Sequence, residues 1–112
     1  MSLDRDALDA GARAALEAAE KEHGELGRKV ALVMTAEGPV VIKRPHRANV
    51  AKFLDSERAT SATMEALVRS CLVYPGRDEF ARLLDEQPAA LTIIASEALT
   101  LAGAGAKALA GK

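Results

Sequence analysis

The sequence has few of the residues that often stabilise or mark a small protein: one cysteine, one tyrosine, two phenylalanines and no tryptophan among 112 residues. A single cysteine excludes an internal disulfide. With so few aromatic side chains, the core must consist of aliphatic residues and alanine, which favours close helix packing over a bulky sheet core. No apolar run reaches about 18 residues, so we expect no membrane-spanning helix.

We also expect no secretory signal, because the N-terminal stretch SLDRDALDAG is acidic and polar where a signal is basic and then apolar. The charges nearly cancel, with 15 basic and 16 acidic residues and a formal net charge of -1. This balance argues against a protein whose main work is to coat nucleic acid or an anionic membrane. We therefore expect a soluble, cytoplasmic protein, and its length suits one domain.

Residues 4–23, DRDALDAGARAALEAAEKEH, have high helix propensity, with acidic residues near the start and basic residues near the end. Gly24 stands where such a helix would stop. The apolar side of this helix is thin, because it consists largely of alanine. We expect residues 1–24 to form an N-terminal helix that packs weakly, or moves, beside a single globular domain at residues 25–103.

The character changes at residues 29–43, where two β-branched runs, KVALVMT and PVVIK, flank a short turn that contains Gly38. This pattern predicts a β-hairpin. Both runs carry apolar residues on both faces, and an isolated two-stranded ribbon is marginal in water. The hairpin must therefore be covered by helices, or extended by another strand from this chain or from a second one.

From Pro45 onward the pattern is helical, with breaks at Pro75-Gly76 and before Pro88. The predicted helices are residues 46–57, 61–74, 77–87 and 88–102, and residues 104–112 form an Ala/Gly-rich flexible tail. The fold class is therefore α+β and mostly α. It consists of an N-terminal helix, one β-hairpin and about four short helices packed on the hairpin.

No catalytic or metal site emerges from the residue types and their spacing. Cys71 continues the helical apolar stripe of Leu67 and Val68, so we interpret it as a buried small hydrophobe rather than a nucleophile. His23 and His46 are separated by the hairpin, and there is no second cysteine to complete a metal site. None of the serines has a Gly-x-Ser-x-Gly frame. We expect a protein that is not an enzyme and that holds neither cofactor nor metal.

One polar cluster has a functional interpretation: the basic patch Lys43, Arg44 and Arg47, joined by Lys52 and Arg58. A basic spot at the start of a helix can contact phosphate or an acidic partner segment. Isolated basic residues at a strand end are, however, more often a solvated face or protection of a sheet edge. As an alternative function, this patch leaves open a small nucleic-acid-associated or regulatory interaction module.

Residues 39–103 contain four features in this order: an apolar strand that runs into Arg44-Pro45, a helix through Phe53, the run LVRSCLVYP, and a short helix leading to Pro88. In this combination the chain resembles the small tail assembly chaperones of tailed bacteriophages and related prophages. The shared residues form core and turns and are not a catalytic signature. His46 and Asn49 depart from the Thr and Glu expected there as a capping pair, which concerns helix stability more than function.

The resemblance implies a non-enzymatic protein of the host cell cytoplasm that binds the tape measure protein and keeps this client soluble during tail assembly. Apolar helical segments of such a client would be covered by helix-in-groove packing. Self-association through the hairpin edge or the N-terminal helix stays open, and neither a membrane nor nucleic acid is the expected partner. The candidate partner-binding residues are Lys43, Arg44, Arg47, Phe53, Tyr74, Ile93 and Leu99.

Overall fold

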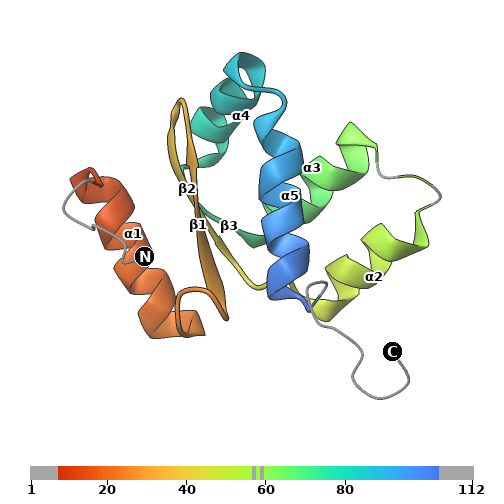
Figure 1. Cartoon of the computed structure of the whole chain (residues 1–112), viewed down its shortest axis with the longest axis horizontal. Helices are drawn as coiled ribbons and strands as arrows, with labels where there is room; N and C mark the ends of the chain where they lie inside the picture. Colours follow the sequence, from red (N-terminus) through yellow and green to blue (C-terminus); the bar gives the residue numbers. More distant parts are fainter. Residues whose placement is uncertain (1–7, 57, 59, 104–112) are drawn as a thin grey trace, which may run out of the picture.

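The computed structural model describes residues 8–56, 58 and 60–103. These residues form five helices and a three-stranded antiparallel sheet, which confirms the predicted α+β, mostly α fold (Figure 1). The elements are α1 (Ala10–His23), β1 (Val30–Thr35), β2 (Gly38–Lys43), α2 (Arg47–Asp55), α3 (Ser61–Cys71), β3 (Leu72–Tyr74), α4 (Arg77–Glu86) and α5 (Ala90–Leu101).

Strands β1 and β2 form the hairpin that the two β-branched runs predicted. Val33 pairs with Val40 and Thr35 with Gly38, so a turn of residues 36 and 37 joins the strands. Gly38 has a φ angle of 123°, a conformation that residues with a side chain rarely adopt. The Thr35 hydroxyl donates a hydrogen bond to the Gly38 carbonyl oxygen at 2.7 Å and closes the turn.

The prediction of one helix over residues 61–74 was wrong at its C-terminal end, where the structure has a third strand, β3. That helix ends at Cys71, and the next three residues pair antiparallel with β2, with Val41 opposite Tyr74. Pro75 disfavours helical geometry at the residue before it, and leucine, valine and tyrosine suit a strand beside an open edge. The strand that the hairpin needed therefore comes from the same chain.

The sheet separates two helical layers (Figure 1). α1 covers one face, while α3 and α5 cover the other. Because side chains alternate along a strand, Val41 faces α1, whereas Val40 and Ile42 face α3 and α5. The buried residues of this second layer, here called the main core, are Ala31, Val33, Val40, Ile42, Leu67, Val68, Cys71, Phe80, Leu83, Leu91, Ile94, Ala95, Ala98 and Leu101.

Helix α1 is packed more closely than its thin apolar side led us to expect. Asp9 begins the helix, and its Oδ1 accepts a hydrogen bond from the Ala12 backbone N–H at 2.7 Å. Alanines let the helix backbone approach the sheet, so even a thin stripe is buried. The buried cluster beneath α1 consists of Leu8, Ala12, Leu16, Ala19, Val30 and Val41. Helix α1 and the sheet therefore share a buried cluster, so α1 is packed onto the strands that follow it in the chain.

Gly11, inside α1, leaves room for the ring of Tyr74 on β3. A Cβ atom at Gly11 would lie 3.3 Å from the Tyr74 hydroxyl oxygen, which is tighter than an ordinary van der Waals contact. The Tyr74 hydroxyl donates to Asp9 Oδ1 at 3.4 Å. The glycine therefore offsets its low helix propensity by allowing α1 to lie against β3.

The remaining boundaries agree with the sequence pattern to within a few residues. α4 begins after the predicted break at Pro75-Gly76, with Gly76 as its N-cap and with Asp78 and Glu79 in its first turn. α5 begins at Ala90 and not at Pro88, because a tighter turn precedes it, in which the Leu91 N–H donates to the Pro88 carbonyl oxygen at 3.3 Å. The predicted tail at residues 104–112 lies outside the described residues. No helix in the described part is long and apolar enough to span a bilayer.

Candidate partner-binding groove beside helix α2

Helix α2 begins where the hairpin ends, and its first turn is held by His46. Pro45 cannot donate to the sheet ladder, so strand β2 stops before it. His46 is the N-cap of α2, and its Nδ1 accepts a hydrogen bond from the Ala48 backbone N–H at 3.1 Å. His46 thus provides a side-chain cap in place of the threonine expected from the resemblance.

α2 differs from α3 and α5 in how little of it is covered. None of its residues is fully buried. Val50 and Phe53 are partly buried against the main core, whereas the side chain of Leu54 is 68% exposed. By contrast, α3 buries Leu67, Val68 and Cys71. The apolar side of α2 is therefore only partly used within this chain.

A groove of about 470 Å³ runs between α2 and the C-terminal end of α5. Its lining residues are Arg44, Pro45, Arg47, Val50, Ala51, Leu54 and Ala102. Most of this lining is apolar, and the two arginines supply its charge. Within the described part of the chain neither arginine has an ion-pair partner. The groove, here called the α2 groove, therefore combines an apolar floor with positive charge that a partner can neutralise.

The opposite side of α2 carries a second depression, of about 260 Å³, between α2 and α3. Its lining residues are Asn49, Lys52, Phe53, Thr63, Ala66 and Leu67. α2 is thus flanked on both sides by open apolar surface. A helix in this position can be contacted by a partner along more than one side.

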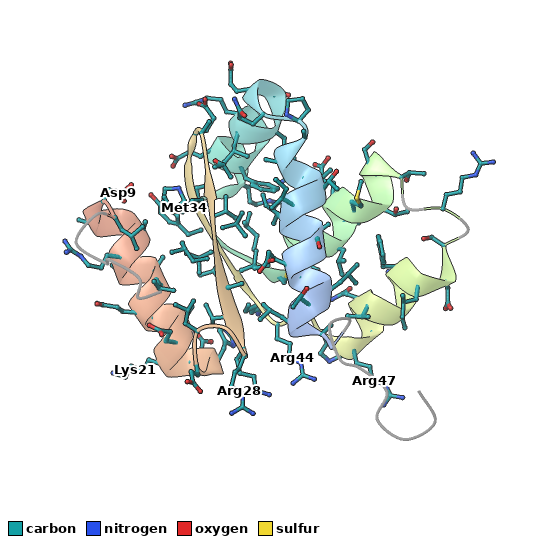
Figure 2. All side chains as sticks on the ribbon, in the orientation of Figure 1. Asp9, Lys21, Arg28, Met34, Arg44 and Arg47 are labelled. Carbon is teal, nitrogen blue, oxygen red and sulfur yellow. The ribbon has the colours of Figure 1, made fainter. Side chains whose placement is uncertain are left out.

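The structure brings only some of the predicted partner-binding residues together. Arg44 and Arg47 line the α2 groove, and Phe53 lines the second depression. Lys43 ends β2 beside Arg44 and is half-buried, and Leu99 is partly buried against the main core. Figure 2 shows Arg44 and Arg47, together with Arg28 from the segment before β1, extending from the lower side of the molecule in this view.

Tyr74 and Ile93 lie away from the α2 groove. Tyr74 lines a separate polar depression with Asp9 and Glu79. Partial desolvation, together with the nearby carboxylates of Asp9 and Glu79, raises the pKa of Tyr74. Ile93 is 59% exposed in the first turn of α5, whereas Ala102, which lines the α2 groove, follows the last turn. These two residues therefore do not form one surface with the arginines.

Five groove residues were not among the predicted candidates: Pro45, Val50, Ala51, Leu54 and Ala102. Val50 and Leu54 are four residues apart, which places them on one side of α2. That spacing was visible in the sequence and indicated a core-facing stripe. The sequence did not show that Leu54 stays 68% exposed in the described structure.

Cys71 has the surroundings of a structural residue. Its side chain is fully buried in the main core, as predicted, and its thiol contacts the carbonyl oxygens of Leu67 and Val68 at 3.6 and 3.4 Å. Burial raises the pKa of the Cys71 thiol to about 11, against a partial lowering by the positive charge of Lys43. Reactive thiols need the opposite setting, with a lowered pKa and solvent access.

Among the described residues, no group of three His, Cys, Asp or Glu side chains is arranged to hold a metal ion. His46 caps α2, and His23 lies in the last turn of α1 with its Nε2 3.8 Å from Glu22 Oε2. Each histidine thus has a local role at the end of a helix.

Residues 35–110 match the family model of a domain of unknown function, DUF6848. The chain belongs to the DUF6848 family. The match begins at Thr35, the last residue of β1, and it contains every residue that lines the α2 groove. α1 precedes the segment matched by DUF6848. No curated protein and no solved structure matches the chain.

Proposed function

We propose that the protein is a phage tail assembly chaperone that binds the tape measure protein and keeps it soluble during tail assembly. The observation that carries this proposal is the α2 groove, in which a partly covered amphipathic helix presents Leu54 beside two arginines without ion-pair partners in the described part of the chain. The resemblance of residues 39–103 to such chaperones supplies the identity of the client.

The expected mode of binding is an apolar client helix laid along α2. Such a helix would cover Val50, Ala51 and Leu54, while acidic residues at its edge would pair with Arg44 and Arg47. Burying a leucine side chain fully is worth about 1.5 to 3 kcal/mol, and most of the Leu54 side chain is still exposed. A few such contacts per copy would suffice for weak, reversible shielding of a long client.

Coexpression with a tape measure protein from the same phage genome tests the proposal. The wild-type chain is expected to raise the soluble fraction of the client. Leu54→Gln is expected to weaken the affinity for the client by about 5- to 30-fold, which corresponds to about 1 to 2 kcal/mol, and therefore to reduce the gain in soluble client. The matched control is Ile93→Gln, because Ile93 is a similarly exposed apolar residue outside the α2 groove. The control should retain full activity.

Two results would count against the proposal. One is an insoluble client in the presence of the wild-type chain. The other is equal loss of activity in Leu54→Gln and Ile93→Gln, which would place client binding outside the α2 groove. Circular dichroism of both variants must match the wild type, so that a loss of folding is not read as a loss of binding.

The alternative, a small nucleic-acid-associated or regulatory module, is favoured by one observation. Arg28, from the segment before β1, extends from the same side of the molecule as Arg44 and Arg47, which lie between β2 and the start of α2 (Figure 2). A module of this kind would bind DNA with an affinity that falls steeply with salt. Joint replacement of Lys43, Arg44 and Arg47 by alanine separates the two functions. DNA binding would be lost, whereas client solubilisation would persist through Val50, Ala51 and Leu54, with only the pairing of acidic client residues to Arg44 and Arg47 removed.

A further inference from the structure

The outer edge of β1 is open. Among the strands that the structure describes, β1 pairs with β2 alone. The Arg44 N–H donates to the Lys29 carbonyl oxygen at 2.7 Å, so hydrogen bonds to β2 come from Lys29 and from every second residue after it. The residues between them direct their backbone N–H and C=O groups outward. Along β1 these outward residues are Val30, Leu32 and Met34.

Part of this edge is occupied by the chain itself. The Gly27 N–H donates to the Val30 carbonyl oxygen at 2.7 Å, and Leu26 forms a bridge with Val30. In the described part of the chain, no backbone hydrogen bond is made to the outward groups of Leu32 and Met34. The open stretch therefore runs from Ala31 to Thr35, between the loop at Gly27 and the hairpin turn, and Val33 is its centre.

This open stretch lacks two of the features that often protect a sheet edge, charged side chains and proline. Strand β1, VALVMT, contains no charged residue and no proline. The side chain of Met34 is 62% exposed and that of Leu32 is half-buried. A shallow depression of about 270 Å³ follows the edge, lined by Leu26, Gly27, Ala31, Leu32, Met34 and Glu97. An edge of this kind is a template for pairing with another strand.

We infer that β1 pairs antiparallel with β1 of a second copy of the chain, with Val33 on the twofold axis. In this register Leu32 of one copy lies opposite Met34 of the other, so the open N–H and C=O groups of both residues are satisfied in both copies. In the same register Lys29 of one copy and Glu37 of the other lie just beyond each end of the paired stretch, so that opposite charges come near each other there. The two three-stranded sheets become one sheet of six strands.

A second copy fits this edge better than an extended client segment does. The open stretch is short, and it is symmetric about Val33, so each copy ends its pairing where the loop at Gly27 begins. A long client strand would meet that loop. The other surface considered for self-association, the apolar side of α1, is already buried against the sheet. The pairing does not depend on the proposed function, because the α2 groove lies on other elements.

The mass of the full chain in solution tests the pairing. Sedimentation or light scattering should give twice the chain mass of 11.8 kDa for the wild type. Met34→Lys places a charge at the open edge and should give a species of 11.8 kDa with unchanged circular dichroism. The matched control is Leu54→Lys, at an exposed leucine away from this edge, and it should remain dimeric. A monomeric wild type, or a dimeric Met34→Lys variant, would overturn the inference.

The register is tested by cysteine substitution, since native Cys71 is buried and does not interfere. A mixture of Leu32→Cys and Met34→Cys chains should form an intermolecular disulfide faster than either variant alone, because residues that face each other across antiparallel strands lie within disulfide range. Faster self-linkage of either single variant would contradict the axis at Val33. A chain that dimerises and still fails to solubilise the client would refute the proposed function alone.

Discussion

Replacing Leu16 by alanine is expected to lower the free energy of unfolding by about 2 to 5 kcal/mol, in one cooperative transition. Leu16 is fully buried between α1 and the sheet, where it packs with Val30 and Val41. Truncation removes apolar contacts and leaves a cavity. Since a domain of this size has about 5 to 15 kcal/mol of stability, the loss is a large fraction of the total.

Leu54→Ala is the matched control for Leu16→Ala, because it makes the same chemical change at a leucine that is 68% exposed. The control is expected to change the stability by about 0.5 kcal/mol or less. Urea unfolding followed by circular dichroism measures both variants. If Leu16→Ala instead released α1 alone and left the midpoint of the main transition unchanged, α1 would be an independent attachment and the shared packing described above would be contradicted.

Raising the pH from about 9 to about 11 is expected to remove up to about 3 kcal/mol of stability through Cys71. The pKa of this thiol is about 11 in the folded chain, against an ordinary value of 9.0. Between these two values the unfolded chain loses the thiol proton and the folded chain keeps it. The stabilisation is therefore fully present below pH 9.0 and is lost as the pH rises toward 11.

The comparison that isolates this effect is the wild type against Cys71→Ala, each unfolded in urea at several pH values. The two chains differ only at position 71, so the difference in their stabilities should shrink as the pH rises. A difference that stays constant from about pH 8 to about pH 11 would show that the thiol is ionised equally in both states. Thiol reagents should also leave native Cys71 unmodified at neutral pH, because it is buried.

The hairpin and most helices followed from the sequence because their signals are local. The β-branched runs around Gly38 and the breaks at Pro75-Gly76 and Pro88 are each decided by residues within a few positions. β3 was missed because its formation depends on residues that are distant in sequence. Leu72 continues the helical spacing of Leu67, Val68 and Cys71, and only the free edge of β2, which is distant in sequence, turns these residues into a strand.

The candidate site was predicted only in part. The two arginines of the α2 groove were identified because charge beside Pro45 is visible in the sequence. The apolar half of the groove was not identified from the sequence, because Val50 and Leu54 have the spacing of a core-facing stripe. Whether such a stripe is buried depends on which other element reaches it, and α5 covers only part of α2 (Figure 1). Exposure of Leu54 is a property of the assembled fold.

The claim that the α2 groove receives the client is tested most directly by photo-crosslinking. A benzophenone-bearing amino acid would replace Leu54 in one chain and Ala81, an exposed residue of α4, in another. Each chain would be coexpressed with the tape measure protein and irradiated. The account predicts a covalent adduct with the client from position 54 and none from position 81. Equal adducts from both positions, or an adduct from position 81 alone, would contradict it.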